Sequence, residues 1–221
     1  MPGVAAAVEV EGLTRRFGSV DILHGVSLRV PEGQVAGIVG KNGAGKTTLL
    51  SILATLLAPS SGLARVLGRD VRSDGPSVRS IVGFAPRSDR GHYGRLSLRD
   101  NLRVFGSLYG LTGVELRKRV DALVEFLGLG PQADQPLQAG SAGMRQRFIL
   151  ARALIHAPPV LLLDEAFLGL DASGAGALAA ILAEWRGRAG RAVLLVAPRV
   201  ADLGFECDAV HVLEDGRMRN V

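Results

Sequence analysis

The chain has 221 residues, 48% of them hydrophobic and 21% charged, which indicates a globular protein and argues against disorder. Its aliphatic windows fall short of the roughly 18 apolar residues that a membrane-spanning helix needs. Its N-terminus has neither the basic start nor the long apolar run of a secretory signal. The single cysteine, Cys207, has no partner in the chain for a disulfide. We therefore expect a soluble cytosolic protein folded as one compact unit.

Positive charge is concentrated in one stretch of the chain. The net charge is +5, from 26 Lys and Arg against 21 Asp and Glu. Between Arg65 and Arg103 there are nine arginines and four aspartates, so this stretch carries the whole excess. Such a basic cluster suits an acidic protein surface, anionic lipid or nucleic acid, and an ordinary solvated face explains it equally well.

The first third of the chain alternates short apolar runs with turns. The runs at Ala6–Val10 and Val26–Val30 predict strands of an antiparallel layer. Residues 34–39 are nearly all apolar, as in a strand that is buried on both faces. A glycine-rich turn follows, and then an apolar helix predicted over Thr47–Leu57. This order of strand, glycine loop and helix is typical of the phosphate-binding unit of an α/β protein.

The rest of the chain is helical first and then alternates strands with a helix. Apolar periodicity and helix-stop residues predict three helices, over Leu98–Leu111, Val114–Leu129 and Ala142–His156. A strand, a helix and a strand follow, at Val160–Leu163, Ala175–Trp185 and Ala192–Val196. The sequence thus predicts an α/β fold with a P-loop NTPase core, an antiparallel β layer and an inserted helical subdomain. We expect one domain over residues 1–221, with the insertion at roughly 88–157.

Residues 40–47 match the pattern G-x-x-x-x-G-K-[ST] in full. The glycines let backbone N–H groups turn toward phosphate oxygens, and the start of the next helix adds positive potential. Lys46 is expected to bridge the β- and γ-phosphates of a nucleotide, and the Thr47 hydroxyl to ligate Mg²⁺. The nucleotide-binding residues predicted here are Gly40, Lys41, Asn42, Gly43, Ala44, Gly45, Lys46, Thr47 and Thr48.

Four aliphatic residues, 160–163, are followed by two carboxylates, Asp164 and Glu165. A buried strand that ends in acids places them beside the phosphate loop. Asp164 is expected to hold Mg²⁺, directly or through water. Glu165 suits the polarisation of a water molecule for attack on the γ-phosphate. Glu165 and Lys46 are therefore the predicted catalytic residues.

The segment Ser141-Ala-Gly-Met-Arg-Gln-Arg opens a helix, and alone it is explained by a plain N-cap as well as by an anion site. Together with the phosphate loop, the Leu-Leu-Leu-Asp-Glu run and the Gly-Leu-Asp at 169–171, it resembles the ATP-binding cassette (ABC) ATPases over essentially the whole chain. The resemblance implies a head-to-tail dimer with ATP at the interface. In it, Ser141 and Gly143 would face the partner's phosphate loop, Asp171 would lie in the loop that crosses the interface, and Phe17 would stack on adenine.

Within the family, Val82-Gly-Phe-Ala-Pro86 and the following Tyr93–Ser97 resemble exporter ATPases for drugs, polyketides and polysaccharides. The resemblance implies a subunit that binds and hydrolyses MgATP to drive a separate transmembrane permease. It would lie in the cytoplasm on the inner face of the cell membrane, paired with a second cassette in a homo- or heterodimer. The basic cluster includes the segment that touches the permease in this family. The permease selects the transported substrate, so this sequence does not specify it.

A third class, the soluble ABC ATPases that act on ribosomes or DNA, normally has two cassettes or a long coiled-coil insert in one chain. The length of 221 residues leaves no room for either, so we expect no nucleic-acid partner.

Two departures from the family pattern concern the γ-phosphate. Arg87 stands where the family usually has Gln, and Pro198 stands where it usually has His. Proline has no titratable group and no N–H, so it cannot replace the contact of that histidine. Smaller departures are Gly140, Ala142 and Ala166. The alternative function is a hydrolysis-deficient regulatory cassette that dimerises on ATP or pairs with a complete cassette. Arg87 and Pro198 favour this alternative, whereas Glu165 favours an active ATPase.

Overall fold

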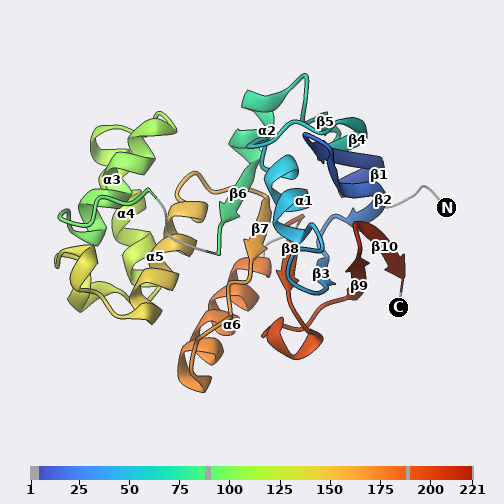
Figure 1. The fold of residues 1–221 in the computed structure, drawn as a ribbon. Helices are drawn as coiled ribbons and strands as arrows, with labels where there is room; N and C mark the ends of the chain where they lie inside the picture. Colours follow the sequence, from blue (N-terminus) through green and yellow to red (C-terminus); the bar gives the residue numbers. More distant parts are fainter. Residues whose placement is uncertain (1–4, 88–90, 188–189, 221) are drawn as a thin grey trace.

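Two β-sheets and the helices around them form the computed structural model, which describes residues 5–87, 91–187 and 190–220 (Figure 1). The smaller sheet is antiparallel, with its strands in the order β2-β1-β4-β5. Its strands are β1 (Ala6–Phe17), β2 (Val20–Pro31), β4 (Ser61–Val66) and β5 (Arg69–Asp70).

The larger sheet has the strand order β10-β9-β3-β8-β7-β6. Strands β9, β3, β8, β7 and β6 run parallel, and β10 pairs antiparallel with β9 at one edge. The bounds are β3 (Val35–Val39), β6 (Val82–Ala85), β7 (Val160–Asp164), β8 (Ala192–Ala197), β9 (Ala209–Glu214) and β10 (Arg217–Asn220). Because parallel strands end at the same edge, the residues that follow β3, β6, β7 and β8 gather there.

The helices fall into two groups. Helices α1 (Lys46–Leu53), α2 (Gly75–Ile81) and α6 (Ala172–Arg186) accompany the sheets. Helices α3 (Leu98–Leu108), α4 (Gly113–Phe126) and α5 (Ala142–Leu154) form a subdomain to one side (Figure 1). Short 3-10 turns lie at η1 (Gly130–Gln132), η2 (Leu137–Ala139) and η3 (Val200–Asp202). No helix in the described ranges is long and apolar enough to cross a membrane.

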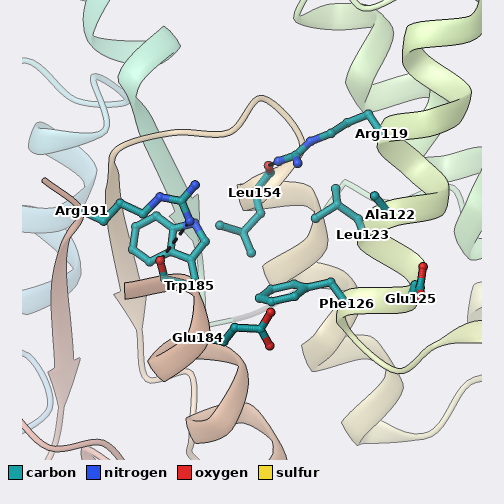
Figure 2. A pocket seen from close by; sticks show the side chains of 9 residues that line it. All are labelled: Arg119, Ala122, Leu123, Glu125, Phe126, Leu154, Glu184, Trp185 and Arg191. Atoms are coloured by element: carbon teal, nitrogen blue, oxygen red, sulfur yellow. Dashed lines mark hydrogen bonds between the residues drawn. The ribbon is translucent and has the colours of Figure 1, made fainter. Parts of the chain in front are cut away.

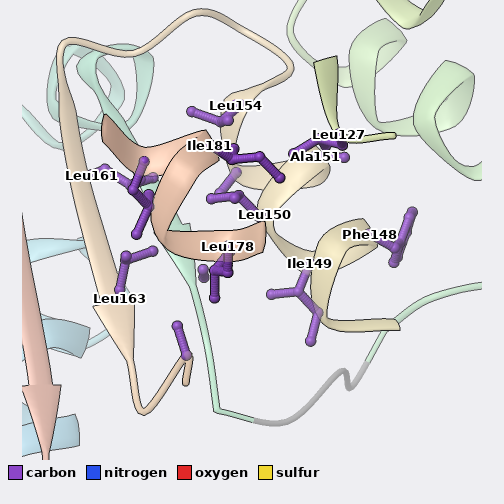
Figure 3. Packing of buried hydrophobic residues seen from close by; sticks show 14 of the residues in the cluster. Leu127, Phe148, Ile149, Leu150, Ala151, Leu154, Leu161, Leu163, Leu178 and Ile181 are labelled. Carbon is purple, nitrogen blue, oxygen red and sulfur yellow. The ribbon is translucent and has the colours of Figure 1, made fainter. Parts of the chain in front are cut away.

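The parallel strands are buried on both faces, and alternate residues serve two hydrophobic cores. In β7, Leu162 packs in the core that α1 shares with the antiparallel sheet. Its neighbours Leu161 and Leu163 face the other core, against Leu150 of α5 and Leu178 of α6 (Figure 3). This two-sided burial is why these strands have nearly continuous apolar sequences rather than alternating ones.

The helical subdomain meets α6 across a cavity of about 440 Å³ (Figure 2). Arg119 of α4 donates to the backbone carbonyl of Ile155 at 2.8 Å on one side. On the other side, the Arg191 guanidinium lies over the Trp185 ring, 4.7 Å from its centroid, and donates to the Trp185 carbonyl at 3.0 Å. Each of these contacts lies within its own side of the interface, so the cavity separates two locally braced surfaces.

The predicted fold class, an α/β core with an antiparallel layer and a helical subdomain, is confirmed. Several element boundaries were wrong: β2 begins at Val20 and not at Val26, α3 ends at Leu108 and not at Leu111, and α4 ends at Phe126 and not at Leu129. The first strand runs to Phe17 and not to Val10, through irregular pairing at its middle. Helix α1 ends at Leu53 and not at Leu57, because Thr55 adopts a φ of 59° that an α-helix cannot continue. The single-domain division stays a prediction, and the start of the insertion at residue 88 lies outside the described residues.

Candidate nucleotide site

The loop after β3 follows a path that only glycine can take at two points. A Cβ on Gly40 would lie 2.1 Å from the Leu213 carbonyl oxygen, so β9 leaves no room for a side chain. Gly45 has a φ of 102°, and a Cβ there would lie 2.7 Å from a methyl carbon of Leu23. The loop therefore wraps tightly and passes directly into α1 at Lys46.

Lys46 lies inside this loop and is only 5% exposed. Its Nζ donates to the carbonyl oxygens of Gly40 at 2.5 Å and Lys41 at 3.1 Å. Burial lowers the pKa of Lys46, and the nearby carboxylates of Glu165 and Asp164 oppose that effect. The ammonium is thus held at the loop by backbone oxygens, near two carboxylates.

Asp164 ends β7 directly beside the first turn of α1. The Thr47 hydroxyl donates to its Oδ2 at 2.9 Å. Burial raises the pKa of Asp164, while the hydrogen bond from Thr47 opposes the rise. Its Oδ1 is buried and accepts no hydrogen bond from any residue in the described ranges.

Glu165 follows with a φ of 53°, an uncommon conformation for a residue with a side chain. Its backbone N–H donates to the Val196 carbonyl at 3.0 Å, which ties this turn to β8. The side chain is 4% exposed, and its Oε2 lies 3.0 Å from Nε of Arg87. This ion pair lacks the alignment of a hydrogen bond.

A cavity of about 250 Å³ brings half of the predicted site residues together. It is lined by Ile22, Asn42, Gly43, Gly45, Lys46, Thr47, Thr48, Arg87 and Glu165. Phe17 lies at the end of β1, 44% exposed, with the Arg15 guanidinium 4.3 Å from its ring centroid. The sequence had marked Arg87 only as a departure from a pattern. Its pairing with Glu165 was not predicted.

Ser141 and Gly143 belong to a different cavity, of about 520 Å³, which also contains Asp171. Ser141 caps α5 by accepting from the Met144 N–H at 3.2 Å. Asp171 caps α6 by accepting from the Gly174 N–H at 2.7 Å. Two helix N-termini therefore face this second cavity. Within one chain, the structure does not bring Ser141 or Gly143 to the phosphate loop.

Comparison with known proteins gives the family. The family model described as "ABC transporter" matches residues 23–168, well over half of the chain. The chain belongs to the ABC transporter family. The prediction of an ATP-binding cassette with ATPase chemistry is therefore confirmed, and the phosphate loop and both carboxylates lie within the matched range.

Individual relatives of this ABC cassette are similar over nearly its whole length. It is 35% identical to the Nod factor export ATP-binding protein I of Ralstonia nicotianae, over 98% of this chain and 67% of that protein. It is 36% identical to the daunorubicin/doxorubicin resistance ATP-binding protein DrrA of Streptomyces peucetius, over 96% of this chain and 64% of that protein. The chain thus spans about two thirds of the length of these relatives.

A solved structure has the same fold. The cbiO1 subunit of Clostridium perfringens, part of the ABC transporter complex cbiONQ, aligns with a TM-score of 0.84 at 27% identity. The alignment covers 97% of this chain and 87% of the other.

Proposed function

We propose that this cassette is the ATP-binding subunit of an exporter, which binds and hydrolyses MgATP to drive a separate transmembrane permease. One observation carries the proposal. Lys46, Thr47, Asp164 and Glu165 converge at one edge of the parallel sheet, beside the glycine loop that follows β3. This edge is where α/β proteins bind nucleotides.

Each of these residues has a role in the proposed reaction. The loop N–H groups and the first turn of α1 would hold the phosphates, and Lys46 would exchange its backbone oxygens for the β- and γ-phosphates. Glu165 would orient a water molecule against the γ-phosphate. Its burial favours this role, because a carboxylate away from bulk water exerts a stronger field on a nearby water molecule.

The residues also fit a magnesium ion. The Thr47 hydroxyl and the Asp164 carboxylate provide two adjacent hard oxygen ligands, and Asp164 has a buried oxygen without a partner in the described residues. When bound with ATP, Mg²⁺ neutralises phosphate charge. Thr47 and Asp164 are the residues that we propose to hold it.

We propose that a second cassette completes the site, in a homo- or heterodimer. Ser141 and Gly143 lie at the start of α5, in a cavity away from the phosphate loop of their own chain. A helix start with free N–H groups is suited to a phosphate, so a partner's bound ATP is the natural ligand of this cavity. Phe17, exposed at the end of β1, is the proposed adenine contact.

The names of two relatives concern the setting of this ATPase. The similar proteins from Ralstonia nicotianae and Streptomyces peucetius are named for export and drug resistance. This supports an exporter subunit on the cytoplasmic face of the membrane. Neither the family match nor these relatives favour the alternative of a hydrolysis-deficient regulatory cassette.

A groove between the core and the helical subdomain is the proposed seat of a cytoplasmic segment of the permease. Its volume is about 460 Å³, and it is lined by Ala54, Leu56, Arg79, Val82, Phe84, Pro86, Phe105, Tyr109, Arg152 and Ala153. Leu56 is 61% exposed beside it, and Arg79 and Arg152 bring positive charge. An amphipathic permease helix with acidic residues at its flanks would match this groove.

Several arginines of the basic cluster are already paired with acids of this chain. Arg65, Arg99 and Arg103 form ion pairs with Glu9, Asp134 and Asp100, respectively. Arg95 is exposed and pairs with no acid in the described part of the chain, whereas Arg90 lies outside the described residues. The proposed docking charges are therefore Arg79 and Arg95.

Co-expression with a candidate permease tests docking. Leu56→Glu and Arg95→Glu should reduce co-purification of the two proteins. Val114→Glu on α4, at 57% exposure, is a matched control for Leu56→Glu and should leave capture intact. Unchanged capture with Leu56→Glu would remove the groove from the proposal, and unchanged capture with Arg95→Glu would leave the cluster as a solvated face.

Phosphate release and assembly state test the function itself. With MgATP we expect turnover that depends on Glu165, and an ATP-dependent dimer of the Glu165→Gln variant by light scattering. Dimerisation of the wild type on ATP without any phosphate release would support the regulatory alternative instead.

A further inference from the structure

Arg87 adds a second positive charge, besides Lys46, to the phosphate-loop cavity. It follows β6 and Pro86, and its side chain lines the same cavity as Lys46, Thr47 and Glu165. Its Nε is 3.0 Å from Oε2 of Glu165. The guanidinium therefore lies at the catalytic carboxylate, where the end of a bound triphosphate would meet the attacking water.

The two partners of this ion pair are held very differently. The Glu165 side chain is 4% exposed and fixed by its turn, whereas the Arg87 side chain is 55% exposed. The pair also lacks hydrogen-bond alignment. Water around the exposed Arg87 guanidinium screens its attraction to the carboxylate and weakens the pair. Arg87 is therefore free to leave Glu165 for a stronger anion.

A terminal phosphate is such an anion. It carries more charge than one carboxylate, and its oxygens accept two parallel N–H groups of a guanidinium, which a lysine cannot offer. A diphosphate bound in the same loop ends one phosphate short of this position. Arg87 would thus contact a triphosphate and leave a diphosphate untouched.

We propose that Arg87 selects the triphosphate over the diphosphate by exchanging partners, from the Glu165 carboxylate to the terminal phosphate. The exchange releases the Glu165 carboxylate to face water only when a triphosphate is present. This inference rests on the proposed binding of ATP in the phosphate loop. It makes Arg87 a specificity-determining residue rather than a defect in the site.

Binding measurements test the selectivity. The probes are the β,γ-imido analogue of ATP, which is not hydrolysed, and ADP, both with Mg²⁺ and titrated by calorimetry. Arg87→Gln should weaken binding of the analogue by about tenfold, the usual size of one charge-assisted contact. The affinity of Arg87→Gln for ADP should stay within about twofold of the wild-type value, because ADP has no phosphate that reaches Arg87. The affinity of Arg87→Lys for the analogue should fall between those of the wild type and Arg87→Gln. Lysine keeps the positive charge but lacks the two parallel N–H groups of the guanidinium.

Arg117→Gln, an exposed arginine on α4, is the matched control and should change neither affinity. An unchanged ratio of the two affinities in Arg87→Gln would overturn the proposal, and so would tighter binding of the analogue. If the wild-type protein binds neither nucleotide, the proposed function is refuted, and this inference with it.

The exchange itself is tested in a Glu165→Gln background. There Arg87 has no carboxylate to leave, so Arg87→Gln should cost more affinity for the analogue than it does with Glu165 present. The measurements are made at concentrations where every variant is monomeric by light scattering, so that dimerisation does not alter the affinities. An equal or smaller cost in the Glu165→Gln background would show that the two residues do not compete.

Discussion

The hydroxyl of Thr47 donates a hydrogen bond of 2.9 Å to Oδ2 of Asp164 and so joins the start of α1 to the end of β7. The two elements come from distant parts of the sequence, and this contact brings together the oxygens that we propose as magnesium ligands. The other carboxylate oxygen, Oδ1, is buried and accepts no hydrogen bond from the described residues. The pair is thus preformed for a cation.

Removal of magnesium should therefore weaken ATP binding, and the effect should depend on the Thr47 hydroxyl. Thr47→Ser keeps the hydroxyl and should bind ATP more tightly with Mg²⁺ than with EDTA, like the wild type. Thr47→Val removes the hydroxyl at nearly constant volume and should lose most of that difference. Equal magnesium dependence in the two variants, measured by titration of folded protein, would argue against Thr47 as a ligand.

Lys46 offers the most direct check of the phosphate loop. Its ammonium contributes a charge-assisted contact of about 1.5–3 kcal/mol, so Lys46→Ala should weaken ATP binding by about ten- to a hundredfold. Lys118→Ala, on the exposed surface of α4, should bind ATP like the wild type. If Lys46→Ala binds as tightly as the wild type in the same titration, the phosphate loop is assigned wrongly.

His156 makes the stability of the fold dependent on pH. Its ring stacks on Tyr109, with centroids 3.9 Å apart, and its Nε2 lies 3.1 Å from the Val82 carbonyl oxygen. Burial lowers the pKa of His156 from 6.5 to about 4; the Val82 hydrogen bond opposes this shift, and the charge of Arg119 adds to it. The unfolded chain therefore binds the proton first on acidification. The contribution of neutral His156 to stability is fully present above pH 6.5 and is lost as the pH falls from 6.5 toward 4.

The loss should be about 2 kcal/mol, less than for a fully buried ring because this one is half-buried. Urea denaturation at several pH values measures it. His156→Gln keeps a donor for the Val82 carbonyl without a titrating group, so its free energy of unfolding should fall less over the same range. An identical slope in both proteins would show that another group titrates.

Sequence patterns predicted best the parts of this molecule that are determined locally. Strands β3 and β7 were predicted because burial on both faces leaves a continuous apolar run, and the glycine loop because residues 40–47 match a complete phosphate-binding pattern. The short elements β4, β5 and α2 were missed, since pairing with β1 and packing define them more than their own residues do.

The contact of Arg87 with Glu165 could not be predicted for a related reason. It joins the ends of β6 and β7, which are neighbours only in the folded sheet. The sequence marked Arg87 as unusual, but the direction of its side chain depends on tertiary structure. The substitution was therefore visible, and its electrostatic partner was not.

Turnover is the quantity on which Glu165 and Pro198 have opposite effects. Pro198 directly follows β8, whose Val196 pairs with Asp164 of β7, so residue 198 lies at the same sheet edge as the carboxylates. Loss of one positioned hydrogen-bond partner of a developing charge typically costs about 10²–10³ in rate. We expect weak but measurable phosphate release at saturating MgATP. Glu165→Gln should reduce it further, because the amide cannot accept a proton from water.

Pro198→His should raise the rate if an imidazole at this edge contacts the γ-phosphate. Proline also restricts the backbone after β8, so Pro198→Ala is the necessary control: it relaxes the backbone without adding a hydrogen-bond donor. The prediction is that Pro198→His releases phosphate faster than both Pro198→Ala and the wild type. If the wild type releases phosphate rapidly and Glu165→Gln does not slow the release, the assigned mechanism is refuted. If Pro198→His folds and is no faster than Pro198→Ala, the missing histidine is not the limiting defect, and pairing with a complete second cassette becomes the better explanation of how this subunit works.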